Sequence, residues 1–242
     1  MSLLALGLSH RSAPVELLDR AALTRDEVGK LLADIRSGEH VAEAAVVATC
    51  NRVEVYADVA RFHGGLEEIT ELLVQHTGLS LAQITPHLYV HYEGRAVQHL
   101  FTVAAGLDSM VAGETQILGQ VRQALQDAQA AQTAGRALNE LFQNALRVGK
   151  RVHSETGIDA VGRDLGSVAR TLVAGQAGPL GGRRALVIGA GSMAALASAA
   201  LRRVGAEVVV ANRSFDRGAR VAASVGGRAI VLGDIPGTLP DV

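Results

Sequence analysis

Short hydrophobic runs alternate with amphipathic segments along the first part of the chain. Leucine-rich or β-branched runs predict four strands, at residues 3–8, 45–48, 53–56 and 88–92. Between them, apolar residues at helical spacing predict helices over residues 15–20, 24–37 and 66–77. The order β-α-β-β-α-β is that of a ferredoxin-like sandwich, so we expect an α+β fold for this part of the chain.

Boundary residues mark the ends of these helices. Thr24 precedes Glu27 by one helical turn, which is the pattern of a capping box, and Gly38 ends that helix. Residues 63–65 predict a turn before the next long helix, which ends at Gly78.

From Glu93 onward the apolar period lengthens from two residues to about 3.6, which indicates a helical subdomain. The pattern predicts helices over residues 96–103, 116–134, 138–152 and 164–174. Gly135 is expected to close the second of these, and a glycine-rich stretch after the last predicts a linker. We therefore predict a first domain at residues 1–155, a connecting helix and linker at 156–182, and a nucleotide-binding domain at 183–242.

The last domain opens with a strand over residues 184–188, which runs into the turn GAGSMA at the start of an alanine-rich helix; a second strand follows at 207–211. This is a Rossmann-type βαβ unit with a dinucleotide fingerprint. Gly189 permits the tight turn, Gly191 lets the backbone approach a pyrophosphate, and Ala194 packs the helix on the strand. The pyrophosphate would lie at the helix N-terminus. The expected cofactor-binding residues of this turn are Gly189, Ala190, Gly191, Ser192, Met193 and Ala194.

The second strand ends at Asn212, Arg213 and Ser214. Sites that prefer NADH place a carboxylate here, whereas a guanidinium pairs with the 2′-phosphate of NADPH. We therefore expect NADPH, with these three residues as further ligands; the alternative is that Arg213 is simply solvated. A helix at 215–225 and a strand at 229–232 complete only half of a doubly wound sheet. The chain is thus expected to be a fragment, or to have lost its end.

Composition restricts the classes of function. The chain has 242 residues, of which 48% are hydrophobic and 19% charged, as in folded globular proteins. Its net charge of −1 gives no overall field that attracts nucleic acid or membranes, so any polyanion contact must be local. The N-terminus lacks a signal-peptide pattern, and no apolar run approaches the roughly 20 residues of a membrane helix. With a single cysteine, which cannot form an internal disulfide, the chain is predicted to be cytoplasmic.

That cysteine, Cys50, lies in a polar break between two predicted strands. Residues 49–52 would place a thiol, an amide and a guanidinium together at one end of a sheet. The alternative is a buried structural cysteine, although such residues usually lie inside apolar runs. A thiol nucleophile and an NADPH site in one chain suggest reduction through a thioester. In that chemistry the thiolate attacks an activated acyl group, and hydride then releases an aldehyde.

Five segments together resemble the glutamyl-tRNA reductase family. They are GLSHRSAP at residues 7–14, TCNRVE at 49–54, GLDSMVAGETQILGQV at 106–121, GKRVHSET at 149–156 and the fingerprint at 189–194. The resemblance implies NADPH-dependent reduction of glutamyl-tRNA(Glu) to glutamate-1-semialdehyde, the first step of tetrapyrrole biosynthesis from glutamate. It also implies that Cys50 is the nucleophile and that His99 is important for activity. The implied substrate-binding residues are Thr49, Asn51, Arg52, Ser109, Glu114, Thr115, Gln116 and Gln120.

Further expectations follow from the same resemblance. We expect Arg52 to pair with the side-chain carboxylate of the substrate glutamate. The family also implies a homodimer, held by a helical dimerisation domain that we expect to be absent from this chain. Its product is expected to pass to a glutamate-1-semialdehyde aminotransferase. Thr115 stands where the family often has proline, a change that we expect to be harmless.

Several assignments leave alternatives open. His99, beside apolar helix neighbours, fits a half-buried packing residue as well as an active-site group. His87, His91 and His99 have no accompanying cysteine or acidic set at ligand spacing, so we expect no metal. The basic cluster of Arg147, Lys150, Arg151 and His153 fits either a solvated helix end or contact with tRNA phosphates. The competing functions are a non-reducing fragment that binds charged tRNA or only acylates Cys50, and an unrelated NADP-dependent dehydrogenase.

Overall fold

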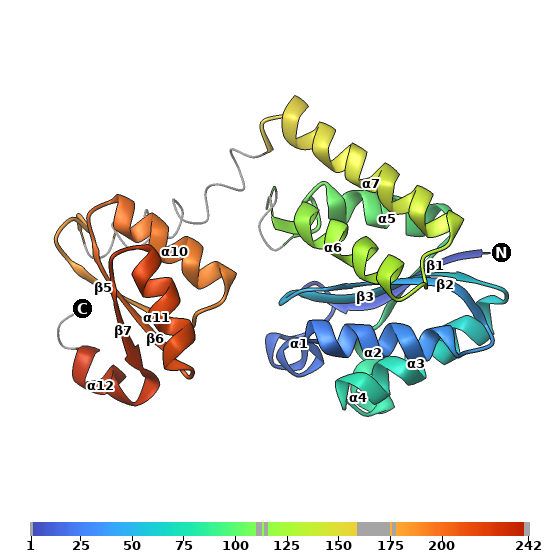
Figure 1. Ribbon diagram of the computed structural model, residues 1–242, viewed down its shortest axis with the longest axis horizontal. Helices are drawn as coiled ribbons and strands as arrows, with labels where there is room; N and C mark the ends of the chain where they lie inside the picture. Colours follow the sequence, from blue (N-terminus) through green and yellow to red (C-terminus); the bar gives the residue numbers. More distant parts are fainter. Residues whose placement is uncertain (1, 110–112, 114–115, 159–174, 176–177, 240–242) are drawn as a thin grey trace. The chain divides into compact units, whose positions relative to one another are not determined.

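The computed structural model describes residues 2–109, 113, 116–158, 175 and 178–239. The chain divides into two compact units, one at residues 1–162 and the other at residues 163–242. Each unit combines a sheet with helices packed on it (Figure 1). Among the described residues, none of the helices has the length and apolar character needed to cross a membrane.

The first unit contains a four-stranded sheet in the order β2-β3-β1-β4, with every neighbouring pair antiparallel. Its strands are β1 (Ser2–Ser9), β2 (Val41–Ala48), β3 (Arg52–Val59) and β4 (Tyr89–Tyr92). The connections are α1 (Val15–Ala21) and α2 (Arg25–Arg36) after β1, and α3 (Phe62–Thr77), α4 (Leu81–Ile84) and a 3-10 turn (Thr85–His87) after β3. This order of elements and strands is ferredoxin-like, so the sequence-based prediction is confirmed.

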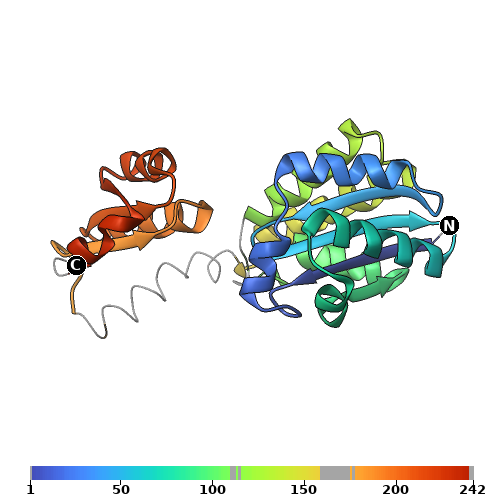
Figure 2. The same cartoon turned by 90° about the horizontal axis from the view of Figure 1, so that it is seen from below.

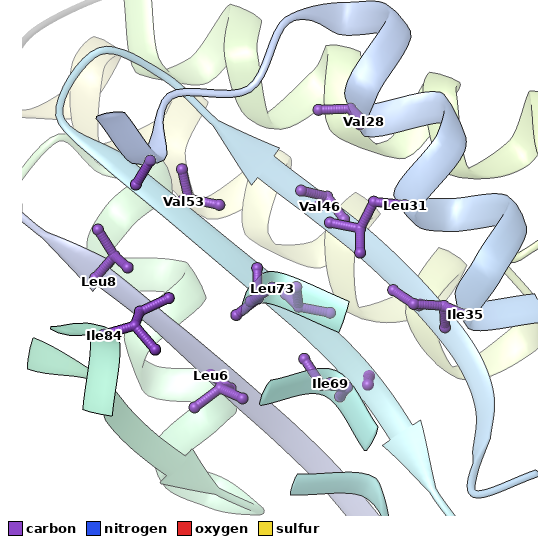
Figure 3. Close-up of a cluster of buried hydrophobic side chains, with 14 of the residues drawn as sticks. Leu6, Leu8, Val28, Leu31, Ile35, Val46, Val53, Ile69, Leu73 and Ile84 are labelled. Carbon is purple, nitrogen blue, oxygen red and sulfur yellow. The ribbon is translucent and has the colours of Figure 1, made fainter. Parts of the chain in front are cut away.

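Helices cover both faces of this sheet. On one face, Leu6 of β1 packs in a common core with Leu31 of α2 and Leu73 of α3 (Figure 3). Helices α2 and α3 contact each other across that face, as the view from below shows (Figure 2). On the other face, Ala5 and Tyr56 pack against α5 (Gly94–Ala104), α6 (Gln116–Ala130) and α7 (Arg136–Glu155). Strand β3 is buried at every position, so any charged side chain on it is withdrawn from water.

Helix α2 begins as predicted. Oγ1 of Thr24 accepts a hydrogen bond from the amide of Glu27, and the Glu27 carboxylate accepts one from the amide of Thr24. The predicted turn at residues 63–65 is wrong, because these residues belong to α3. Their glycines provide space instead: a Cβ on Gly65 would lie 2.4 Å from Cγ1 of Val59. Glycine therefore lets this helix start directly against the sheet.

Helix α6 ends at Ala130, before the predicted end at residue 134. Gln132 has a left-handed φ of +59°, which helical continuation does not allow. The amides of Thr133 and Ala134 both donate to the carbonyl of Ala128, which closes the helix. The helical spacing of apolar residues continues through this turn, and no glycine marks the turn in the sequence. The predicted helix was therefore too long.

Gly135 is the N-cap of α7 rather than the end of α6. The Glu43 carboxylate, from β2, accepts hydrogen bonds from the amides of Ala137 and Leu138 at 3.2 and 2.8 Å. It thereby satisfies donors that a helix start leaves open. A Cβ on Gly135 would lie 2.3 Å from the same carboxylate, so glycine makes room for this cap.

The second unit contains three parallel strands in the order β5-β6-β7. Its elements are β5 (Arg184–Ile188), α10 (Ser192–Arg203), β6 (Glu207–Asn212), α11 (Phe215–Ser224), β7 (Arg228–Val231), a 3-10 turn (Leu232–Asp234) and α12 (Ile235–Thr238). This is the expected half of a doubly wound sheet. The predicted helix at 164–174 lies outside the described residues, and the predicted domain limits at residues 155 and 182 remain predictions.

Candidate active site

A tight loop between β2 and β3 carries Cys50. The amide of Thr49 donates to the carbonyl of Arg52 at 2.8 Å, and the amide of Asn51 donates to Oγ1 of Thr49 at 3.1 Å. Cys50 is exposed on this loop, so the alternative of a buried structural cysteine is wrong. A small hollow lies beside the thiol. Its lining consists of Thr49, Cys50, Asn51, Arg52, Ser109, Ile117 and Gln120.

Arg52 forms the charged floor of this hollow. Its side chain is only 2% exposed and pairs through Nη1 with Oε1 of Glu54 at 2.8 Å. Nη2 pairs with Oδ2 of Asp108 at 3.0 Å and also donates to the carbonyl of Asp108. Burial disfavours the charged guanidinium, but the nearby Glu54, Tyr89, Asp108 and Tyr56 together outweigh burial and raise the pKa of Arg52. The guanidinium is therefore a fixed cation, held between two carboxylates.

Glu54 is the anion at the centre of the cluster. Its carboxylate accepts hydrogen bonds from Arg52, from the hydroxyl of Tyr56 at 2.7 Å, from the hydroxyl of Tyr89, and from Nε2 of His99 at 2.9 Å. Burial alone would raise the pKa of Glu54, but the hydrogen bond from His99 and the charge of Arg52 lower it to about 2. Burial and the Glu54 charge raise the pKa of both tyrosines, so these remain neutral donors.

His99, on α5, is held by Glu54 and by aromatic neighbours. Its ring stacks on His91 of β4 with centroids 4.3 Å apart, and it meets the edge of Tyr89 at 5.4 Å. Burial and the neighbouring His99 lower the pKa of His91. Because Glu54 is ionised, its hydrogen bond places the proton of His99 on Nε2.

The loop after β1 lies against the same cluster. The amide of His10 donates to the carbonyl of Asn51 at 2.9 Å. Nε of Arg11 pairs with Oδ1 of Asp108 at 2.7 Å, so this carboxylate bridges Arg11 and Arg52. Burial, followed by the charge of Arg52, lowers the pKa of His10.

The second unit contains an open cleft of about 470 Å³ where β5 and β6 end. The residues that line it are Ile188, Gly189, Asn212, Arg213, Ser214, Arg217 and Leu232. Gly189 adopts a φ of +108°, which favours glycine, and its amide donates to the carbonyl of Ala211 at 2.7 Å. Nδ2 of Asn212 donates to the carbonyl of Ser214 at 2.8 Å, which fixes the following turn.

The chemistry of this cleft suits a phosphorylated dinucleotide. Gly191 is the N-cap of α10, so free backbone amides point towards the end of β5, as a pyrophosphate requires. Ala194 packs against the sheet core with Val187, which is the packing role predicted for it. The described lining contains two guanidinium groups and no carboxylate, so it suits a 2′-phosphate better than a free 2′-hydroxyl.

A model of the family described as "Glutamyl-tRNAGlu reductase, N-terminal domain" matches residues 6–156. The chain belongs to the glutamyl-tRNA reductase family. A second model, described as "Shikimate / quinate 5-dehydrogenase", matches residues 171–242 and so covers the unit with the dinucleotide cleft. Both units of the chain are thereby accounted for.

Curated glutamyl-tRNA reductases are similar to the chain over most of its length. The protein from Streptomyces avermitilis is 61% identical over 226 residues, which are 92% of this chain and 40% of that protein. The protein from Kineococcus radiotolerans is 52% identical over 235 residues, which are 97% of this chain and 53% of that protein. The solved glutamyl-tRNA reductase from Methanopyrus kandleri is 32% identical, with a TM-score of 0.60 over 99% of this chain and 56% of that chain. The chain thus spans about half the length of these relatives.

The structure brings only some of the predicted glutamyl-tRNA-binding residues together. The structure gathers five predicted substrate residues around Cys50: Thr49, Asn51, Arg52, Ser109 and Gln120. Gln116 begins α6 one turn before Gln120 and is not among the residues of the lining. Glu114 and Thr115 lie outside the described residues. His99 is also absent from the lining and reaches Arg52 through Glu54.

Likewise, only some of the predicted cofactor-binding residues line the cleft of the second unit. Gly189, Asn212, Arg213 and Ser214 line the cleft, and Ala190 and Gly191 connect it to α10. The side chains of Ser192 and Met193 lie outside the described part of the chain. Arg217, on the first turn of α11, was missed; its helical position one turn after Arg213 was the available signal.

Sequence reasoning also missed much of the polar cluster. Glu54, Tyr56, Tyr89, His91, Asp108 and His10 were not singled out as site residues. A charged Glu54 between Val53 and Val55 in an apolar strand was the available signal, because a buried charge needs a partner.

The argument against a metal needs correction. The fold does bring acidic groups to a histidine, since ligand atoms of Glu54, His99 and Asp108 lie within 4.8 Å of one another. The guanidinium of Arg52 already pairs with both carboxylates. A metal cation would have to displace it, so these residues fit an arginine better than a metal.

Proposed function

We propose that this chain catalyses the NADPH-dependent reduction of glutamyl-tRNA(Glu) to glutamate-1-semialdehyde through a thioester on Cys50. The observation that carries the proposal is the placement of the thiol: an exposed Cys50 stands beside a hollow whose floor is the fixed cation Arg52. Family membership supplies the substrate class. The cleft of the second unit supplies residues suited to the reductant.

In the first step the Cys50 thiolate attacks the ester carbonyl of the aminoacyl group. A carbon–sulfur bond forms, the carbon–oxygen bond to the terminal ribose breaks, and the ribose oxygen takes up a proton as it leaves. The exposure of Cys50 permits its thiolate to attack an ester carried by a macromolecule. Ser109 supports binding, because its Oγ is buried and has no hydrogen-bond partner among the described residues.

Arg52 would recognise the side-chain carboxylate of the glutamyl group. A guanidinium has five N–H donors, and Glu54 and Asp108 do not use all of them. The two carboxylates hold the guanidinium in place, so no side-chain freedom is lost when substrate binds. Discrimination against glutamine follows, because both carboxylate oxygens of glutamate accept hydrogen bonds from the remaining guanidinium N–H groups, whereas the amide nitrogen of glutamine is a donor and cannot.

His99 acts in this proposal as a positioning residue. It donates to Glu54, and Glu54 orients Arg52. A residue that acts in this way affects substrate recognition and the rate of acylation together. A direct role of His99 in activating the thiol is the alternative that the family resemblance left open.

The second unit would hold NADPH. Gly189, Gly191 and the start of α10 would bind the pyrophosphate, and Arg213 with Arg217 would bind the 2′-phosphate. When bound, NADPH supplies the hydride that converts the thioester into the aldehyde. For the whole protein we also propose the homodimer and the transfer of product to a glutamate-1-semialdehyde aminotransferase that the family resemblance implies.

The test incubates the chain with glutamyl-tRNA carrying labelled glutamate, with and without NADPH. We expect label on Cys50 without NADPH and free aldehyde with it, and Cys50→Ser should lose both. Acylation without aldehyde in either condition would favour the second candidate, a chain that performs only acyl transfer; the observation behind that candidate is that the described residues of the second unit form a sheet of three strands. Full reductase activity in Cys50→Ser would exclude the thioester.

A further inference from the structure

The most exposed charge of the ion-pair network around Arg52, the arginine in the floor of the Cys50 hollow, is a cation. Arg11 exposes 60% of its side chain, whereas its partner Asp108 exposes 14%. The remaining charges of the network, Arg52 and Glu54, are 2% and 0% exposed. Both carboxylates are therefore less exposed than Arg11, so a molecule that approaches this network from solvent meets a guanidinium.

This guanidinium is held in place but keeps donors available. Its Nε pairs with Asp108, and Nη2 makes only a long contact of 3.5 Å with the carbonyl of Leu107. In the described part of the chain no acceptor pairs with Nη1. The loop is closed by backbone hydrogen bonds: the amides of Ser12 and Ala13 both donate to the carbonyl of Ser9 at 2.9 Å. A cation held in this way binds an anion at little entropic cost.

An apolar surface adjoins this cation. Leu107, whose carbonyl Arg11 contacts, is itself exposed, and it precedes Asp108 and the hollow-lining Ser109 directly in the chain. An exposed guanidinium thus lies beside an exposed apolar residue, which is close in the chain to Ser109 of the hollow. Proteins that bind single-stranded nucleic acid combine positive charge for the backbone with side chains, usually aromatic, that pack against the bases; Leu107 offers an aliphatic contact of this kind.

We propose that Arg11 and Leu107 form the docking site for the 3′-terminal nucleotide of the aminoacylated RNA. Arg11 binds a backbone phosphate, and Leu107 packs against the terminal nucleoside. The inference rests on the proposed function, because a glutamyl ester held in the hollow places its ribose and the adjoining phosphodiester at the mouth. A chain of net charge −1 needs such a local contact to bind a polyanion.

The test compares Arg11→Gln and Arg11→Lys with the matched control Arg136→Gln in the whole 242-residue chain. The control also neutralises an exposed arginine that pairs with a carboxylate, since Arg136 pairs with Glu140 at 2.9 Å on α7. One assay measures the affinity for glutamyl-tRNA at several salt concentrations. The other measures the burst of p-nitrophenolate released when Cys50 attacks the α-p-nitrophenyl ester of glutamate, which has no nucleotide.

We expect Arg11→Gln to weaken binding of glutamyl-tRNA about five- to tenfold. Log affinity falls as log salt rises, and this fall should become shallower by about 0.7 to 0.9 in slope because one phosphate contact is lost. Arg11→Lys should keep most of this salt dependence. In both variants the burst with the small ester should fall far less than the binding of glutamyl-tRNA falls in Arg11→Gln. Arg136→Gln should change neither the salt dependence of glutamyl-tRNA binding nor the burst.

Three results would overturn the proposal. An unchanged salt slope in Arg11→Gln would exclude the phosphate contact. If the burst with the small ester fell as much as the affinity for glutamyl-tRNA, Arg11 would act only by positioning Arg52 through Asp108. A loss of slope in Arg136→Gln alone would place the RNA on α7. If the unaltered chain reacts with the small ester but does not bind glutamyl-tRNA, the proposed function fails as well, so the two failures are distinguishable.

Discussion

Arg52 and Glu54 lie two positions apart on β3 and form an ion pair of 2.8 Å in which both side chains are buried. Side chains alternate along a strand, so both face the side of the sheet that packs against α5 to α7, while Val53 and Val55 face the other core. An isolated charge at this depth would strongly destabilise the fold. Each member of the pair therefore depends on the other.

Glu54→Gln keeps the shape of the side chain and removes its charge. Arg52 then remains buried with Asp108 as its carboxylate partner, and the loss of one member of a buried pair costs about 3 kcal/mol of unfolding free energy. Urea denaturation followed by circular dichroism measures this loss. Glu155→Gln is the matched control: it breaks the exposed pair with Arg151, at 2.9 Å, and should leave the urea midpoint unchanged. Equal midpoints for the two variants would contradict the prediction.

The same carboxylate gives stability a defined pH dependence. The hydrogen bond from His99 and the charge of Arg52, working against burial, lower the pKa of Glu54 from 4.5 to about 2 in the folded chain. As pH falls, the unfolded chain binds this proton first. The stability contributed by ionised Glu54 is thus present above pH 4.5 and is lost as pH falls towards about 2. The difference in unfolding free energy between the wild type and Glu54→Gln should shrink across this window. A difference that stays constant there would show that Glu54 titrates normally.

Glu43→Ala removes the cap that β2 provides for α7. Two helix-start amides, of Ala137 and Leu138, lose their acceptor, and we expect a loss of about 1–2 kcal/mol in unfolding free energy. Glu43→Gln keeps an acceptor and should lose less. A double-mutant cycle with Gly135→Ala provides the check, because the added methyl clashes with the carboxylate and should be tolerated once Glu43 is truncated. Additive effects would mean that the two residues do not interact.

Arg213→Gln tests the nucleotide preference of the second unit. Loss of a charged hydrogen bond to the 2′-phosphate should weaken NADPH binding by about ten- to a hundredfold and leave NADH binding unchanged. Titration of nicotinamide fluorescence measures both affinities. Arg220→Gln is the control, because Arg220 lies on the same helix and is not among the residues lining the cleft. An equal loss of both nucleotides would show that Arg213 does not read the 2′-phosphate.

The periodicity of the sequence predicted the fold well, because strands and helices each leave their own spacing of apolar residues. Two of its errors concern glycine. Gly64, Gly65 and Gly135 resemble turn or stop signals in the sequence. In the structure they instead provide space for His40, Val59 and Glu43, respectively. A single sequence does not show whether a glycine serves backbone conformation or close packing.

The sequence predicted the part of the site whose residues are neighbours in the chain, and it did not predict the contacts between residues far apart in the chain. The loop that holds Cys50 lies within a few residues, so its polar break is visible in the chain. Two partners of Glu54 are distant: Tyr89 lies 35 residues away and His99 lies 45 residues away. They meet only because β4 pairs with β1 and α5 packs on the sheet, and these contacts follow from the register of the sheet.

Strand β3 pairs with β1 and β2 along almost its whole length, and it carries both Arg52 and Glu54. Its amides reach solvent only when the sheet opens, so their hydrogen exchange should report global unfolding. Local fraying therefore cannot remove the charges beneath Cys50. A library of variants confined to the surrounding loops would change what the chain binds while leaving that buried charge pattern untouched.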